Sequence, residues 1–109
     1  MLFRSIVSPA HGWLNGIAYA DLVDALGEAL GRARAESGIL ATLSLTAVRA
    51  PGPLFGPANA ARIVDEARAH PSPYVRGFGV AGDTRFDDLA DYAPAFAAAR
   101  RAGLVTRAH

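Results

Sequence analysis

The fold is decided by residues 74–83, which read Tyr-Val-Arg-Gly-Phe-Gly-Val-Ala-Gly-Asp. The β-branched and aromatic side chains of this stretch favour a packed strand, and Gly77 and Gly79 allow another backbone or a ligand to come close. The run breaks at Gly82-Asp83, which would be the carboxyl end of a buried parallel strand. Because α/β proteins place their chemistry at that edge, Gly82 and Asp83 are the first candidate site residues. A turn into the next helix is the simpler explanation of the Gly-Asp pair.

Strand and helix patterns alternate along the rest of the chain. Apolar runs predict strands at residues 2–7, 39–48 and 104–109, and helical spacing predicts helices at 19–37, 58–69 and 92–102, the last capped by Asp91. Stretches rich in proline or glycine predict loops at residues 9–16 and 49–57. This alternation predicts an α/β fold of about four parallel strands and three helices, with right-handed crossovers. The pattern leaves open a doubly wound sheet or an arc of a barrel, and the final strand favours the arc.

The composition restricts the class of protein. The 109 residues are 51% hydrophobic and 19% charged, with a formal net charge of +1 and no cysteine. The weak, scattered charge argues against nucleic-acid binding, and the missing cysteines exclude disulfides and thiolate metal sites. No apolar run approaches the length of a membrane span. We expect a single cytoplasmic domain over residues 1–109 that does not insert into membranes.

The three histidines do not form a complete site by spacing alone. His11, His70 and His109 lack the His-x-His or His-x-x-x-His arrangement that metal and acid-base sites often use. His70 is best explained as a helix C-terminal residue favoured by the helix dipole. His11 could line a site at the carboxyl edge, although an exposed loop histidine is the simpler interpretation. His109 ends a predicted strand, where a parallel barrel places metal ligands.

Two nucleotide and hydrolase signatures are weak or absent. Residues 77–82 spell Gly-x-Gly-x-x-Gly, but the glycines lie within the predicted strand instead of after it, and the next helix starts too late. The sequence contains no nucleophile elbow and no phosphate loop. An NAD-binding function is therefore a poor hypothesis.

Several motifs, in order and at strand ends, carry a family resemblance. They are Ser8-Pro9 with His11, Gly38-Ile39, residues 46–49, residues 77–83 (Gly-Phe-Gly-Val-Ala-Gly-Asp), residues 91–96 (Asp-Tyr-Ala-Pro-Ala-Phe), residues 98–100, residues 102–104 and a strand ending in His109. Over nearly its whole length the chain resembles the adenosine deaminase family. The resemblance implies part of an eight-stranded β/α barrel, with these strands similar to the second to fifth.

The resemblance also implies a chemistry. Members of that family are zinc-dependent hydrolases that remove the 6-amino group of a purine nucleoside by attack of a metal-bound hydroxide, converting adenosine to inosine and ammonia. Gly82 would correspond to the glycine whose backbone N–H contacts the purine ring. His109 would correspond to the zinc-binding histidine that opens a His-Ala-Gly-Glu motif. Zinc would bring the pKa of its bound water near neutrality.

Departures from the family pattern limit what the chain can do alone. The paired His-x-His of the first barrel strand, the Ala-Gly-Glu after His109, and a later histidine and aspartate are all absent. Arg4 stands where the family usually has an acidic residue, and Thr84 stands where glutamate is common. A catalytic zinc takes three protein ligands and a water, so we expect the isolated chain not to hold zinc and to be inactive.

Three functional hypotheses follow. The chain could be an enzyme fragment completed by another polypeptide, or a non-catalytic half-barrel that self-associates or binds a small purine-like ligand. An independent open-sheet nucleotide binder is the weakest hypothesis. With half a barrel missing, the two sheet edges would be unpaired and Leu40, Leu43, Val75 and Phe78 partly exposed. We therefore expect self-association or a complementing barrel fragment.

Overall fold

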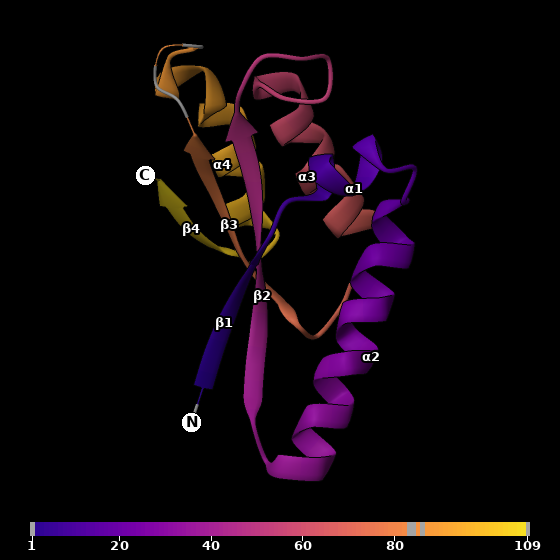
Figure 1. The fold of residues 1–109 in the computed structure, drawn as a ribbon. Coiled ribbons are helices and arrows are strands. Elements are labelled where there is room, and N and C mark those ends of the chain that lie inside the picture. Colours follow the sequence, from indigo (N-terminus) through magenta and orange to yellow (C-terminus); the bar gives the residue numbers. More distant parts are fainter. Residues whose placement is uncertain (1, 83–84, 86, 109) are drawn as a thin grey trace.

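The chain folds around one parallel sheet. The computed structural model describes residues 2–82, 85 and 87–108. The strands are β1 (Leu2–Val7), β2 (Leu40–Arg49), β3 (Val75–Gly82) and β4 (Val105–Ala108), and they lie side by side in the order β1-β2-β3-β4, all parallel (Figure 1). Each new strand is added on the same side of the previous one. That order is the singly wound order of a β/α barrel and differs from the reversing order of a doubly wound sheet.

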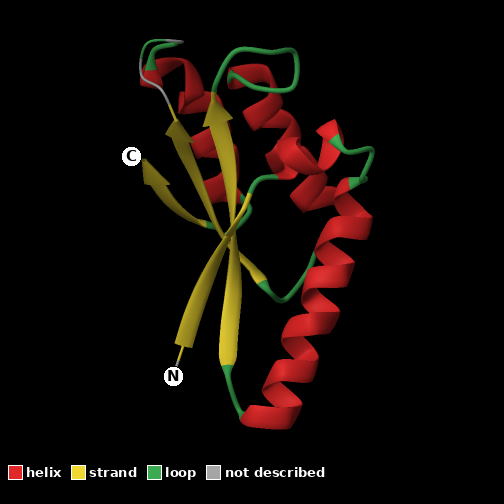
Figure 2. Cartoon of the chain, viewed as in Figure 1, coloured by secondary structure: helices red, strands yellow, loops and turns green. Residues whose placement is uncertain are grey.

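Helices connect the strands. They are α1 (Pro9–Leu14), α2 (Tyr19–Ser37), α3 (Pro57–Ala69) and α4 (Ala93–Arg101), preceded by the 3₁₀ turn η1 (Leu89–Tyr92) (Figure 2). The bounds of β1 and α2 match the prediction, and the other predicted strands and helices are present with shifts of one residue or a few at their ends. Among the described residues, no helix is both long enough and apolar enough to cross a membrane.

Two local predictions were wrong. Residues 9–16 were predicted to be a loop, but Pro9 occupies the first turn of α1, where a proline costs no helical hydrogen bond. Asp91 was predicted to cap the helix that follows, but it lies inside η1. The capping carboxylate belongs to Asp88, which accepts a hydrogen bond from the Ala90 backbone N–H at 3.0 Å.

The core lies between one face of the sheet and the helices. Leu43, Phe78 and Val75 are at most 8% exposed and belong to this core. The prediction that these three side chains are partly exposed was therefore wrong, because they point toward the helices and not into the barrel interior. Leu40, at the start of β2, is 42% exposed, as predicted.

Glycines shape the opposite face of β3. A Cβ on Gly77 would lie 2.8 Å from the Ser44 hydroxyl oxygen, and a Cβ on Gly79 would lie 2.9 Å from the Arg107 carbonyl oxygen. Both distances are shorter than real Cβ atoms tolerate, so only glycine lets the neighbouring strands approach β3 this closely. The close approach predicted from the sequence is thus made by the neighbouring strands of the sheet.

Candidate functional site

The carboxyl edge of the sheet brings Gly82 opposite the end of β2. Gly82 is exposed and pairs in register with Arg49. Its φ of 114° lies in the region that favours glycine, and a Cβ there would come within 2.5 Å of the Arg49 carbonyl oxygen. Glycine is therefore required at this position by the backbone itself.

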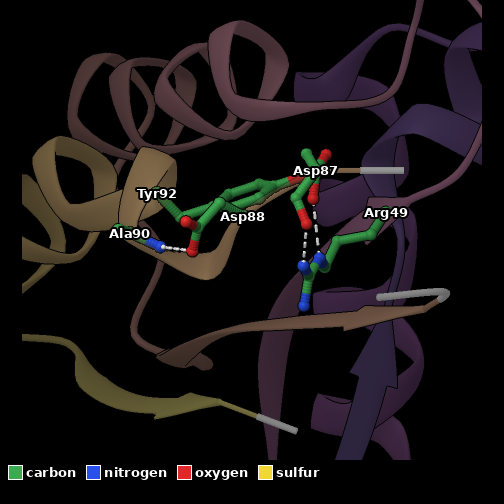
Figure 3. Close-up of polar contacts among 5 residues, drawn as sticks. All are labelled: Arg49, Asp87, Asp88, Ala90 and Tyr92. Atoms are coloured by element: carbon green, nitrogen blue, oxygen red, sulfur yellow. Dashed lines mark hydrogen bonds and ion pairs between the residues drawn. The ribbon is translucent and has the colours of Figure 1, made fainter. Parts of the chain in front are cut away.

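A buried polar cluster lies beside this edge (Figure 3). The side chain of Arg49 is 4% exposed, and its Nε donates to Asp87 Oδ1 at 2.6 Å, while Nη2 donates to the Asp87 backbone carbonyl. The hydroxyl of Tyr92, in η1, donates to the other carboxylate oxygen of Asp87 at 2.7 Å. The cluster therefore ties the end of β2 to the segment between β3 and α4.

This cluster has a structural role. Both carboxylate oxygens of Asp87 accept hydrogen bonds within the cluster, and its backbone carbonyl accepts one from Arg49. Burial, and then the hydrogen bond to Asp87, raise the pKa of Tyr92 well above its ordinary value of 10, so its hydroxyl stays protonated at neutral pH. A charge-assisted network of this kind fixes Asp87 and η1 against the end of β2.

His11 lies at the same edge, in α1, directly after β1. Its Nδ1 is 2.7 Å from the Ser8 hydroxyl oxygen, and its ring centroid lies 5.5 Å from that of Phe55 in the loop between β2 and α3. The side chain is exposed. The structure therefore places His11 at the edge where the sequence allowed a site, on a helix and not in a loop.

His70 lies elsewhere. It is the C-cap residue of α3, which leads into the amino end of β3, and its Nε2 lies 2.7 Å from Asp24 Oδ1 on α2. Its ring meets that of Tyr19 edge-on, with the centroids 6.5 Å apart. The interpretation as a helix C-terminal residue is confirmed, and His70 has no part in the carboxyl edge.

The described residues do not form a zinc site. Within residues 2–82, 85 and 87–108, no group of three or more histidine, cysteine, aspartate or glutamate side chains could hold a metal ion. His109, Asp83 and Thr84 lie outside the described residues. The donor set of the described part therefore does not fit a catalytic zinc, and no reaction step can be assigned to it.

Sequence reasoning missed the members of the buried cluster. Arg49 was included in a predicted loop, Tyr92 was assigned to the start of a predicted helix, and Asp87 was given no role. The available signal was a charged residue at the end of an apolar strand, because a guanidinium in that position needs a partner. The identity of the partner could not be read from the sequence, because Asp87 lies 38 residues further along the chain.

The comparison with solved structures defines the class of fold. An amidohydrolase from Burkholderia ambifaria, solved with bound Zn, superposes with a TM-score of 0.88 at 28% identity, covering 99% of this chain and 29% of that one. The adenine deaminase of Arthrobacter aurescens superposes with a TM-score of 0.85 at 19% identity, over 99% of this chain and 32% of that one. The fold is therefore part of a β/α barrel of the amidohydrolase type.

The sequence relatives are more specific. The adenine deaminase of Rhizobium johnstonii is 38% identical over 104 residues, and that of Mesorhizobium japonicum is 41% identical over 102 residues. These matches cover 95% and 94% of this chain, which spans 31% and 30% of the length of the two relatives. No protein-family model matches the chain. The homologues are thus adenine deaminases, matched over about a third of their length.

Proposed function

We propose that this chain supplies the purine-facing arc of a zinc-dependent deaminase that removes the 6-amino group of a purine. The observation that carries the proposal is the similarity to adenine deaminases over 95% of the chain. On this proposal, residues 1–109 act as one unit that resembles strands two to five of the barrel. Because the chain spans only 31% of that relative, the rest of the active site comes from further polypeptide.

Gly82 is proposed to place its backbone N–H against the purine ring. Its exposure at the carboxyl edge supports this role, because parallel barrels bind their ligands there. The Arg49–Asp87–Tyr92 cluster holds η1 against the end of β2, which pairs with Gly82 at this edge. Glycine is already required there by its φ, so substitution of Gly82 cannot by itself test purine contact.

His109 is proposed as one zinc ligand of the complete site. It follows directly after the last residue of β4 in the sequence. On this proposal the remaining ligands and the group that protonates the purine come from further polypeptide, since no group of three or more possible ligands could hold a metal ion among the described residues. We therefore expect no deaminase activity from the chain alone.

A chimera tests the proposal. The matching segment of the Rhizobium johnstonii adenine deaminase is replaced by this chain, and the zinc-loaded protein is given adenine or adenosine while the ultraviolet absorbance is followed. We expect turnover of adenine, the substrate in the relatives' name. Turnover of adenosine instead would support the nucleoside specificity that the family resemblance suggested. His109→Ala in the chimera should abolish zinc retention and turnover, whereas His70→Ala should abolish neither.

A chimera that folds and retains zinc but converts neither purine would contradict the proposal. Folding is checked by circular dichroism and zinc by elemental analysis, so failure to fold is recognised separately. The second candidate function is a non-catalytic half-barrel that binds a purine-like ligand, and it is favoured by the missing ligand set of the described residues. Shifts of the Gly82 amide resonance on adding adenine to the intact, inactive chain would support that candidate.

A further inference from the structure

Helix α1 is followed directly by the dipeptide Asn15-Gly16, and both residues are exposed. Asparagine is a thermolabile residue, because its side-chain amide can be attacked by the backbone nitrogen of the next residue. Glycine in that next position has no side chain to shield the nitrogen. Apart from the two adjacent residues, no described atom lies within 4 Å of the position that a Cβ on Gly16 would take. The dipeptide therefore has both the chemistry and the space for this reaction.

The reaction converts the side-chain amide of Asn15 into a carboxylate. The Gly16 nitrogen loses its proton and forms a bond to Asn15 Cγ, which closes a cyclic imide. The bond between Cγ and Nδ2 breaks, and Nδ2 takes up a proton and leaves as ammonia. Water then opens the ring at one of its two carbonyl carbons, giving aspartate, or isoaspartate with an extra carbon in the main chain. The only co-reactant is water.

Two hydrogen bonds restrain the reaction in the folded chain. Asn15 Nδ2 donates to the His11 carbonyl oxygen at 2.8 Å, and the Gly16 N–H donates to the Trp13 carbonyl oxygen at 3.1 Å. Both bonds must break before the nitrogen can reach Cγ, so the last turn of α1 has to open. A helix of six residues is marginal by itself, and its packing holds it closed, including the Arg62 guanidinium of α3 that lies over the Trp13 ring.

The chain contains an internal comparison, because it has two asparagines and no glutamine. The other asparagine, Asn59, lies within α3, and its Nδ2 donates to the carbonyl oxygens of Pro53 at 2.9 Å and Phe55 at 3.0 Å. The backbone nitrogen that follows it belongs to the buried Ala60 and donates to the Gly56 carbonyl oxygen at 3.0 Å. Both reacting groups of Asn59 are therefore held by a longer, packed helix.

We propose that Asn15-Gly16 is a site of spontaneous deamidation, and that the opening of the last turn of α1 sets its rate in the folded chain. The product weakens that turn, because a carboxylate cannot donate a hydrogen bond to the His11 carbonyl oxygen and instead repels it. The modification is one-way. It concerns the chemistry of the chain itself and does not depend on a purine substrate.

Peptide mass spectrometry tests the site. The folded chain and the chain in urea are incubated at mildly alkaline pH and then cleaved after arginine, which places Asn15 and Asn59 in separate peptides. We expect Asn15 to deamidate in both samples, roughly tenfold or more slowly in the folded chain, and Asn59 to stay intact in the folded chain. An intact Asn15 in the folded chain, or a folded rate equal to the rate in urea, would overturn the proposal.

Arg62→Ala tests the control by α1. Arg62 is exposed, and its loss removes the contact with Trp13, so deamidation of Asn15 in the folded chain should become roughly two- to fivefold faster while the rate in urea is unchanged. The matched control is Glu66→Gln, which removes the ion pair of Arg62 and leaves the guanidinium over Trp13. An unchanged folded rate in the first variant, or an equal rise in the control, refutes the gating by α1.

Asn15→Asp reproduces one of the two products. The amides of Gly16 and Ile17, which donate to carbonyl oxygens within α1, should exchange with solvent several-fold faster in this variant than in Asn15→Ala. Alanine removes the same donor without adding a charge, so equal exchange in the two variants would refute the repulsion. Circular dichroism checks that every variant is folded.

Discussion

At the residue scale, two buried tyrosines differ in the hydrogen bonding of their hydroxyl groups. Tyr92 is fully buried and donates to Asp87, whereas the hydroxyl of Tyr19 has no hydrogen-bond partner among the described residues. A buried polar group without a partner destabilises the folded state, while a hydrogen bond to a charged acceptor stabilises it. Removing each hydroxyl should therefore have opposite effects.

Tyr92→Phe is expected to lower the free energy of unfolding by about 1.5–3 kcal/mol. The substitution leaves Asp87 Oδ2 without its donor in a site where the carboxylate is only 14% exposed. Urea denaturation at pH 7 measures the change. Tyr74→Phe is the matched control, because the Tyr74 hydroxyl has no hydrogen bond to a described residue, and an equal loss in both variants would contradict the role of the cluster.

Tyr19→Phe is expected to leave stability unchanged at pH 7 or raise it by up to about 1 kcal/mol. Burial raises the pKa of Tyr19 to about 12, with a smaller contribution from Glu66. Between pH 10 and 12 the unfolded chain loses this proton first, so the folded state binds more protons and the stability of the wild type falls as pH rises.

In Tyr19→Phe, the free energy of unfolding should fall less steeply between pH 10 and 12 than in the wild type. The difference for one ionising group is roughly 1 kcal/mol per pH unit. Denaturation curves at several values from pH 9 to 12 test the difference. A slope identical to that of the wild type would show that Tyr19 ionises as easily in the folded chain as in the unfolded one.

Most elements could be predicted because their signals are local. The bounds of α2 are set by its apolar spacing and by Gly38, which has φ 71° at the helix C-cap. Helix α1 was missed because it is only six residues long, and a proline and a glycine within it resemble a loop. Its stability comes from packing: a Cβ on Gly12 would lie 3.3 Å from the Leu22 side chain, so α1 lies directly against α2.

Gly38→Ala is expected to destabilise the chain by about 1 kcal/mol, because alanine pays a steric penalty in the left-handed conformation. Apart from the two adjacent residues, no atom lies within 4 Å of the position that a Cβ would take, so the cost comes from the local backbone conformation and not from a clash with the rest of the fold. Thermal unfolding followed by circular dichroism gives the change. Gly38→Asn should cost clearly less, since asparagine tolerates this conformation, and equal losses in the two variants would exclude backbone strain as the cause.

At the scale of the whole molecule, the sequence could predict the partial barrel but not the contacts between residues that are far apart in the chain. Alternating strands and helices predicted the parallel sheet, and the strand order then distinguished an arc from a doubly wound sheet. The place of Gly82 at the end of β3 could be predicted, because the glycine that breaks an apolar run is visible in the sequence. The Arg49–Asp87 pair could not be found, since it depends on which distant residues the topology brings together.

Amide hydrogen exchange should divide the sheet into a protected centre and two labile edges. The amides of residues 44–48 in β2 and 78–81 in β3 lie between neighbouring strands and under the core, so we expect them to exchange most slowly. Amides of β1 and β4 should exchange roughly tenfold or more faster, because each of these strands pairs with only one other strand of the described chain. Uniform protection across all four strands, measured by nuclear magnetic resonance, would show that the edges are covered in solution.

The single tryptophan of the chain, Trp13, lies at the contact between α1 and α3. The guanidinium carbon of Arg62, on α3, stands 3.7 Å from the centre of the Trp13 ring on α1, an arrangement in which the positive charge faces the indole. Its ultraviolet emission is therefore a built-in reporter of the junction between α1 and α3. Without any added dye, a change in emission colour or quenching distinguishes local opening at this end of the barrel arc from loss of the whole fold.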